Sequence, residues 1–221
     1  VVRAHAMDKI EMLARILQAD GRGPTIVFCR TKRTAQKTSD DLFERGFRAA
    51  TIHGDLGQSA REKALNDFKA GKSDVLIATD VAARGIDIDG ITHVINYQCP
   101  EDEKTYVHRI GRTARAGAAG IAVTFVDWDE LARWKMIDTA LVLGLPEPVE
   151  TYSSSEHLFE MLNIPAGSTG RMTKKSATAV DKPKSDRPKS DRPRSEKAVE
   201  PKKPAAERVK RERTRTKRIS E

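Results

Sequence analysis

Cysteine, long apolar runs and a secretory pattern are scarce or absent in this 221-residue sequence. The two cysteines, Cys29 and Cys99, are too few for a disulfide framework and lie in no Cys/His cluster with the spacing of a zinc site. No apolar run reaches the roughly 18 residues of a membrane span, and Val1–Asp8 lacks a charged-then-apolar leader pattern. These absences argue against a secreted, metal-binding or membrane protein and favour a reducing, cytoplasmic setting.

Aromatic residues are missing from positions 171–221, which hold five of the ten prolines and a near-repeat, KSDRP, at 184–188 and 189–193. This segment has 19 basic and 8 acidic side chains, a net charge of +11, whereas positions 1–170 have 21 and 24, a net charge of −3. So little apolar surface cannot offset the entropy of ordering the chain. We therefore expect one domain over 1–165 and a disordered basic tail, rich in Pro, Lys and Arg, over 166–221.

A complete phosphate-binding P-loop is also missing. Gly71-Lys72-Ser73 resembles the end of one, but the glycine expected five positions earlier is Asn66. A P-loop follows a strand and opens a helix, whereas this triplet closes an expected helix and leads into an expected strand. No Asp-Glu-x-Asp metal motif occurs either. Any nucleoside triphosphate is therefore handled with only half a site on this chain.

The first 145 residues alternate between two hydrophobic patterns. Short apolar runs predict strands at 25–29, 49–52, 75–78, 91–96 and 120–126. Amphipathic segments predict helices at 7–19, 31–45, 59–70, 100–110 and 127–141, with Thr31 and Asp127 as N-caps and Ser59 with Glu62 as a capping box. This alternation predicts an α/β fold with a parallel sheet of about five or six strands and helices on both faces. Ligands of such sheets bind at the carboxyl ends of the strands.

The loop after the second expected strand, 53–61, combines groups that suit a phosphate backbone. Gly54 allows close approach of a ligand to the main chain. Gln58 and Arg61 stand at the start of a helix, where free backbone N–H groups favour anions. Taken alone, the loop is equally consistent with a plain turn and a solvated helix start.

The loop after the third expected strand, 79–88, brings a hydroxyl and two carboxylates to the strand end. Thr79 and Asp80 follow the apolar run directly, and Asp87 lies beyond Arg84 and Gly85. A ligand site and a plain connection in which Arg84 pairs with a carboxylate are both compatible with this pattern.

Three arginines with a spacing of three residues distinguish the segment 106–117. Arg109, Arg112 and Arg115 repel one another unless an anion lies opposite, and His108 stands beside them. Arginine is the side chain best suited to bidentate phosphate contacts. The alternative, a solvated helix face, is disfavoured by Gly111 and Gly117.

Together these strings resemble the DEAD-box RNA helicases of helicase superfamily 2. TIVFCRT at 25–31 matches motif IV, and IHGDLGQSAREKALNDFKAG at 52–71 matches the motif IVa region. VLIATDVAARGIDI at 75–88 matches motif V, and YVHRIGRTARAG at 106–117 matches motif VI. The resemblance covers about residues 5–145 and implies the second, C-terminal RecA-like domain. One departure is Ala114, at a position that is usually glycine in the family.

The resemblance implies that ATP lies between two domains and that RNA crosses both. Arg112 and Arg115 match arginine fingers, and His108 and Arg109 match positions that couple the nucleotide site to the facing domain. Gly85 and Asp87 match the ATP-binding loop, in which the carboxylate lies near the ribose. The positions that match contacts to RNA phosphates are Gly54, Gln58, Arg61 and Thr79.

From the resemblance we expect the C-terminal half of an ATP-dependent RNA helicase that unwinds short duplexes locally. The first RecA-like domain, which binds Mg²⁺ and carries the P-loop, is expected to be absent, so that this chain alone is inactive. The tail is expected to bind RNA without sequence preference. Two alternatives remain open at this point: a non-enzymatic RNA-binding module, and the second domain of a superfamily 2 DNA helicase.

Overall fold

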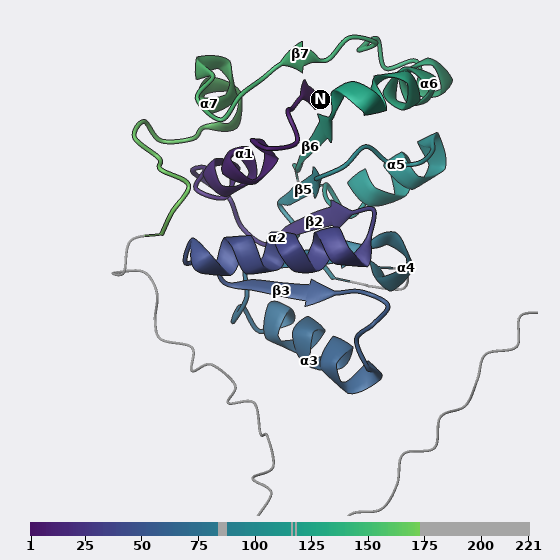
Figure 1. Cartoon of the computed structure of the whole chain (residues 1–221). Helices are drawn as coiled ribbons and strands as arrows, with labels where there is room; N and C mark the ends of the chain where they lie inside the picture. Colours follow the sequence, from purple (N-terminus) through teal and green to yellow (C-terminus); the bar gives the residue numbers. More distant parts are fainter. Residues whose placement is uncertain (84–87, 116, 118, 173–221) are drawn as a thin grey trace, which may run out of the picture. The chain divides into compact units, whose positions relative to one another are not determined.

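A computed structural model describes residues 1–83, 88–115, 117 and 119–172 (Figure 1). Its strands are β1 (Val2–Arg3), β2 (Thr25–Cys29), β3 (Ala49–Ile52), β4 (Val75–Thr79), β5 (His93–Asn96), β6 (Ile121–Val126) and β7 (Val149–Glu150). Its helices are α1 (Lys9–Ile16), α2 (Lys32–Glu44), α3 (Gln58–Lys69), α4 (Asp80–Ala83), α5 (Glu103–Ile110), α6 (Leu131–Leu141) and α7 (Glu156–Leu162), and a 3₁₀ turn at Trp128–Glu130 precedes α6. None of the described helices is long and apolar enough to cross a membrane.

The strands form one seven-stranded sheet in the order β3-β4-β2-β5-β6-β1-β7. All of its strand pairs are parallel. The predicted α/β fold with a parallel sheet is therefore confirmed, and the five predicted strands are all present. The sheet has two strands more than those five because β1 and β7, of two residues each, extend it beyond β6.

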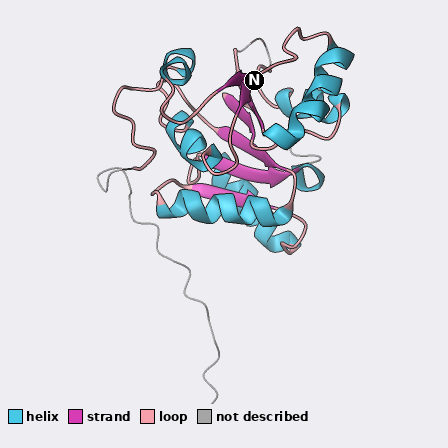
Figure 2. Ribbon diagram, turned by 45° about the horizontal axis from the view of Figure 1, so that its top comes forward, coloured by secondary structure: helices cyan, strands magenta, loops and turns pink. Residues whose placement is uncertain are grey.

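Helices cover both faces of the sheet, as predicted (Figure 2). Within β2, Val27 and Cys29 belong to one buried cluster, which includes residues of α1, α2 and α7. Ile26 and Phe28 belong to a second cluster, with residues of α3 and α4. This alternation is that of a strand buried on both faces, which explains the continuous apolar run in the sequence. A third cluster joins α5 and α6 around the fully buried Trp134.

The ends of the helices follow local sequence signals, with one correction. Thr31 accepts a hydrogen bond from the backbone N–H of Thr34 (3.1 Å) and caps α2, as predicted. The predicted capping box of Ser59 and Glu62 is wrong, because α3 begins at Gln58 after an extended Gly57. Gln58 instead donates from Nε2 to Glu62 Oε1 within the helix (2.7 Å).

The segment that follows α7 extends the contacts of the body past the boundary expected at residue 165. The backbone N–H of Gly170 donates to Gln18 Oε1 (2.7 Å), and the N–H of Met172 donates to the carbonyl of Arg45 (2.9 Å). Met172 also packs against the cluster that contains α1 and α2. Residues 166–172 therefore contact the body, while the division into a domain and a tail stays a prediction. Residues 173–221 lie outside the described part of the chain.

Candidate functional site

The loops singled out in the sequence follow the carboxyl ends of parallel strands and therefore lie at one edge of the sheet (Figure 1). Ile52 at the end of β3 pairs in register with Ala78 of β4, and Cys29 of β2 pairs with Thr79. The loops that begin at His53, Asp80 and Arg30 are thus neighbours. This is the edge at which ligands of such sheets bind.

Arg109 is the most completely bonded side chain of this edge. Its guanidinium forms a bidentate pair with Asp80, with Nε to Oδ1 and Nη2 to Oδ2 both 2.7 Å. Nη1 donates to Asn96 Oδ1 and to the carbonyl of Gln98, both at 3.2 Å, and the group lies 5.4 Å from the ring centre of Phe28. The residue is only 1 % exposed. The anion expected opposite the three arginines is therefore, for Arg109, the protein's own carboxylate.

This pairing fixes α5 to the strand ends. Asp80 follows β4 directly, and Asn96 is the last residue of β5. A buried charge is tolerated only when it is paired and hydrogen-bonded, and here every nitrogen of the guanidinium has an acceptor. Arg109 therefore has a structural role: it holds in place the end of α5, which Arg112 and Arg115 follow.

His108 and Arg112 lie beside this anchor at the wall of a small cavity. The cavity has a volume of about 80 Å³, and its lining includes Asp80, Thr105, His108, Arg109 and Arg112. Arg112 Nε donates to the carbonyl of His108 (3.3 Å). Arg115 Nε donates in the same way to the carbonyl of Gly111 (3.0 Å). The structure therefore brings His108 and Arg112 together, with Arg115 three residues further along the chain, beyond the end of α5.

Ala114, the departure noted in the sequence, adopts a left-handed backbone conformation with φ of 54°. Glycine reaches this region without steric cost, whereas alanine pays for the clash of its Cβ with the following carbonyl oxygen. The geometry explains why glycine suits this position. Alanine keeps the same backbone here at a local cost in strain.

The four residues expected to contact RNA also meet at this edge. Gly54 is exposed, and a Cβ added there would meet no atom within 4 Å, so its backbone is open to a ligand. Gln58 is the first residue of α3, and Arg61 lies in the same turn. Arg61 Nη2 donates to the carbonyl of Ala82 (3.3 Å), which ties α3 to the segment after β4. Thr79 is the least accessible of the four, at 8 %.

His53 holds the loop that contains Gly54. Its Nδ1 accepts a hydrogen bond from the backbone N–H of Asp55 (3.3 Å), so its Nε2 carries the proton and donates to Gln36 Oε1 (3.2 Å). The ring is buried. Sequence reasoning treated this histidine only as the start of the loop, because the partner on α2 is not visible in the local pattern.

Glu130 is a second residue that the sequence did not reveal. Its carboxylate is almost fully buried and accepts from Lys9 Nζ (3.4 Å), Arg30 Nη1 (3.1 Å) and the backbone N–H of Cys99 (3.3 Å). It also completes a capping box with Asp127. The sequence signal was this Asp-x-x-Glu spacing, of which only Asp127 was used.

One connected set of polar groups therefore spans the carboxyl ends of the central strands. Arg109 reaches the carbonyl of Gln98, the side chain of Gln98 accepts from the backbone N–H of Arg30 (3.0 Å), and Arg30 pairs with Glu130. We call Asp80, Asn96, Arg109 and Glu130 the carboxyl-edge cluster.

Neither cysteine is poised for chemistry. Burial raises the pKa of Cys29 to about 12, and burial together with the nearby Glu130 carboxylate raises the pKa of Cys99 to about 12. Both thiols therefore stay protonated and poorly nucleophilic near neutral pH. Among the described residues, no group of three His, Cys, Asp or Glu side chains is placed to hold a metal ion. Gly85 and Asp87, expected at the ATP, lie outside the described residues.

Comparisons with known proteins agree with this geometry. The family model "Helicase conserved C-terminal domain" matches residues 8–117. The ATP-dependent RNA helicase CshA of Listeria monocytogenes is 50% identical over 137 residues, which is 62% of this chain and 26% of that protein. The DEAD-box ATP-dependent RNA helicase CshA of Geobacillus kaustophilus is 46% identical over 137 residues and is covered to 29%. The chain thus spans about a quarter of the length of these curated relatives.

Solved structures show the same fold. The E. coli DEAD-box protein SrmB, bound to regulator of ribonuclease activity A, superimposes with a TM-score of 0.63 at 33% identity, covering 71% of this chain and 90% of that one. The C-terminal domain of the DEAD-box protein Dbp5 gives a TM-score of 0.62 at 33% identity, covering 73% and 92%.

Proposed function

Since this chain belongs to the DEAD-box helicases as their C-terminal RecA-like domain, we propose that it is the part of an ATP-dependent RNA helicase that closes on ATP and RNA from one side. Closing two domains on one strand bends or separates a short duplex locally. The chain supplies the residues that reach the nucleotide from the far side, together with half of the RNA-binding surface.

The observation that carries this proposal is the arrangement of Arg109 and Arg112. Arg109 is fully bonded inside the domain, and Arg112, three residues later, stands at the wall of the cavity beside it. An arginine held on so rigid a support can reach a transferring phosphoryl group without reorganisation, which is the role of an arginine finger. Arg115 acts as the second finger, and His108 couples the site to the facing domain.

ATP is the substrate, and its ribose and phosphates meet the segment after β4. We assign ribose contact to Asp87 and the shape of the loop to Gly85, as the family resemblance implies. No P-loop or Asp-Glu-x-Asp motif occurs in the 221 residues. The groups that hold the β-phosphate and Mg²⁺ therefore come from the facing first RecA-like domain.

RNA is bound through its phosphates by Gly54, Gln58, Arg61 and Thr79. The amino end of α3 offers free backbone N–H groups beside the open backbone of Gly54, and such ends favour anions. Contacts of this kind position a strand without reading its sequence. Among relatives, S. cerevisiae Dbp5 has been solved bound to RNA and ADP BeF3, with 33% identity and a TM-score of 0.63 to this chain.

The basic segment 171–221 adds affinity for RNA without sequence preference. It carries a net charge of +11 but no aromatic side chain on which a base could stack. If about five of its cations engage at once, they contribute about −3 to −4 to the salt slope of single-strand binding. In a protein that joins this chain to a first RecA-like domain, deleting 173–221 should flatten that slope and leave kcat at saturating RNA unchanged. An unchanged slope would remove this role.

The two free, buried thiols fit a cytoplasmic location.

The function is tested by ATP hydrolysis. Residues 1–221 alone should show no RNA-stimulated ATPase activity, and joining them in cis to the first RecA-like domain should create it. Stimulation by RNA but not by DNA of the same sequence distinguishes an RNA helicase from a DNA helicase. Binding of RNA without any hydrolysis by the joined protein would instead indicate a non-enzymatic RNA-binding module and overturn the proposal.

A further inference from the structure

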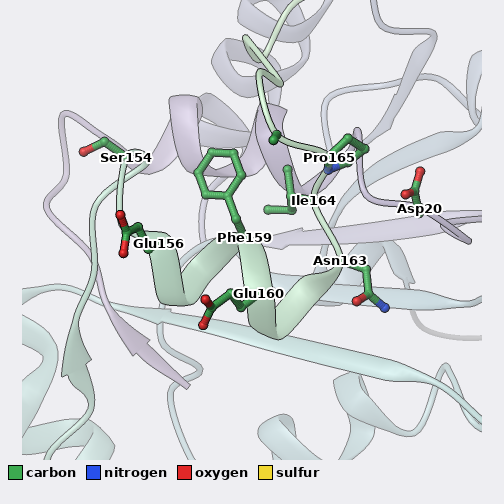
Figure 3. Close-up of a pocket in the computed structure, with 9 residues that line it drawn as sticks. Asp20, Ser154, Glu156, Phe159, Glu160, Asn163, Ile164 and Pro165 are labelled. Atoms are coloured by element: carbon green, nitrogen blue, oxygen red, sulfur yellow. The ribbon is translucent and has the colours of Figure 1, made fainter.

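A large pocket lies at the end of the sheet opposite the candidate site. It has a volume of about 710 Å³ and is lined by residues of α7, of the segment after α7, and by Asp20 and Ser154 (Figure 3). Asp20 follows α1 and precedes the amino end of β2, and its backbone N–H donates to the carbonyl of Asn163 (2.9 Å). The pocket therefore faces away from the carboxyl ends of the strands and shares no residue with the site described above. We call it the α7 pocket.

Its floor is apolar and well supported. Phe159 and Ile164 lie side by side in the pocket, with Pro165 beyond them (Figure 3), and Ala166 also lines it. Ile164 is buried in the main core cluster, against which Phe159 packs. The guanidinium of Arg15 lies 5.7 Å from the ring centre of Phe159 and fixes the ring from the side of the body. The floor is thus a preformed apolar surface. The volume of the whole pocket is in the range of ligand-binding pockets.

Its rim carries negative charge without internal partners. Asp20, Glu156 and Glu160 are exposed lining residues, and none of them has an ion pair or a hydrogen bond to its carboxylate within the described part of the chain. The contrast with Glu11 nearby is direct, since that carboxylate pairs with both Arg15 and Arg45. Among the described residues, no lysine or arginine lines the pocket. Within that part of the chain, the three carboxylates therefore face a volume without a compensating cation.

We propose that the α7 pocket is the docking site for a basic segment of a partner protein, in which an apolar side chain is flanked by arginines or lysines. The apolar side chain packs on Phe159, Ile164 and Pro165. The flanking cations pair with Glu156 and Glu160 on one side of the floor and with Asp20 on the other, as their positions in Figure 3 allow. The occupant is protein and not nucleic acid, because three unpaired carboxylates repel a phosphate backbone.

The position of the pocket gives the partner a specific freedom. A segment held at the amino edge covers none of Gly54, Gln58, Arg61, Thr79 or Arg112, so it stays bound whether or not the opposite edge is occupied. The proposal is independent of the proposed ATPase function, and its test requires neither ATP nor RNA. Binding at the α7 pocket would attach this domain to the partner protein that carries the basic segment.

The test uses the full 221-residue chain and a labelled peptide in which a leucine–phenylalanine pair is flanked by two arginines on each side. Binding is followed by fluorescence anisotropy. When added unlabelled, neither the matched peptide with glutamate in place of each arginine nor a second with serine in place of the apolar pair should displace the labelled basic peptide. Affinity for the basic peptide should fall as salt is raised, because the contacts lie at the exposed rim.

The decisive variant is the double substitution Glu156→Lys/Glu160→Lys. Both side chains are exposed and unpaired in the described part of the chain, so the variant should fold, which circular dichroism verifies. We expect it to lower the affinity for the basic peptide at least about tenfold and to bind the acidic peptide instead. Glu44→Lys/Glu101→Lys makes the same change of net charge at exposed positions outside the pocket and should change the affinity less than about twofold.

Each outcome decides the matter. Selective loss in the pocket variant, with gain of the acidic peptide, supports the site. Equal losses in both double variants would show bulk attraction between charges and overturn it. The absence of saturable binding to the unaltered chain below about 1 mM, or unchanged binding when the apolar pair is replaced by serine, would overturn it as well.

Discussion

The carboxyl-edge cluster and the α7 pocket differ in how their charged side chains are partnered. At the carboxyl ends of the strands, Asp80 and Arg109 meet in a bidentate pair, and the buried Glu130 accepts from three other elements. At the amino ends, the carboxylates of the α7 pocket have no partner among the described residues. Charged side chains of the carboxyl-edge cluster build the domain, whereas the carboxylates of the α7 pocket are available to another molecule.

The role of a charged residue in this fold depends on its partners in the folded domain, which the sequence alone does not reveal. In the sequence, Arg109 has the same spacing as Arg112 and Arg115 and was predicted to face an anionic ligand. In the structure, all three of its guanidinium nitrogens donate to acceptors inside the protein. Glu156 and Glu160 looked like ordinary surface acids, yet they border a preformed apolar floor. Partnering within the domain therefore distinguishes Arg109 from Glu156 and Glu160, which residue type and spacing do not.

The largest expected effect concerns Arg112, which stands at the margin of the carboxyl-edge cluster. In the protein that joins this chain to a first RecA-like domain, Arg112→Ala should lower kcat for ATP hydrolysis roughly 10³-fold, because the charge on the transferring phosphoryl group loses its partner. Arg112→Lys keeps the charge but not the planar fork and should still cost at least about tenfold. RNA affinity and the unfolding midpoint in urea should change little. A normal kcat in the alanine variant would make Arg112 a structural residue like Arg109.

The next effect tests the contrast in stability with two amide substitutions that remove only charge. Asp80→Asn leaves the 1 % exposed Arg109 without its counter-charge and should lower the unfolding free energy by about 3 kcal/mol. Glu160→Gln removes a carboxylate with no described partner and should change it by less than about 0.5 kcal/mol. Urea denaturation of the 221-residue chain measures both. Similar values for the two variants would show that the carboxyl-edge cluster and the α7 pocket do not differ in how charge contributes to stability.

The third effect is a pH dependence of stability, which reports how well Cys29 and Cys99 are shielded from water at the carboxyl ends of the strands. Burial raises the pKa of Cys29 and of Cys99 from 9.0 to about 12, so the folded protein favours the protonated thiols. Their stabilising contribution is complete below the unfolded pKa near 9 and is lost as the pH rises toward 12. Between about pH 8 and pH 9.5, we expect each thiol to lower the unfolding free energy by roughly 1 kcal/mol.

The control for this effect is the double variant Cys29→Ala/Cys99→Ala, in which that part of the pH dependence should vanish. A thiol reagent should label neither cysteine in the native protein at neutral pH and both in denaturant. Rapid native labelling would show that water reaches the strand ends and would weaken the picture of a closed cluster.

The smallest effect concerns Ala114, whose φ of 54° suits glycine. Ala114→Gly should relieve the strain of the left-handed conformation and raise the unfolding free energy by about 1 kcal/mol, less any gain in the flexibility of the unfolded chain. Thermal unfolding measures the shift. Ala→Gly at Ala60, inside α3, should act in the opposite direction by about 1 kcal/mol, because there glycine only weakens a helix.

The parts of the fold that could be predicted are those in which a local pattern suffices. The continuous apolar run at 25–29 indicated burial on both faces, which the structure confirms, and all five predicted strands are present. Strands β1 and β7 could not be predicted, because two residues carry no periodicity and their pairing depends on distant partners. Helix α7, with seven residues, was missed because its apolar side chains became meaningful only once packed against α1.

The candidate site was predictable as a set of loops but not as a set of bonds. Parallel strands guarantee that Gly54, Thr79 and the residues after them share an edge, and the structure places them there. The pairing of Arg109 with Asp80 could not be predicted, because the two residues lie 29 positions apart. Arg84, only four positions from Asp80, was an equally good cationic partner for that carboxylate in the local sequence. The roles of Arg112, Arg115 and His108 in catalysis stay predictions.

Strand β1 has a consequence for how this domain is assembled in time. Val2 pairs with Phe125 on one side and with Val149 on the other. The backbone N–H of Thr151 also donates to the carbonyl of Arg3 (2.9 Å). Contacts between residues so distant along the chain form slowly, because a large loop must close before any bond is gained. We expect this side of the sheet to be the last to form after synthesis, leaving the outer edge of β1 open to wrong pairing until residues 149–150 emerge.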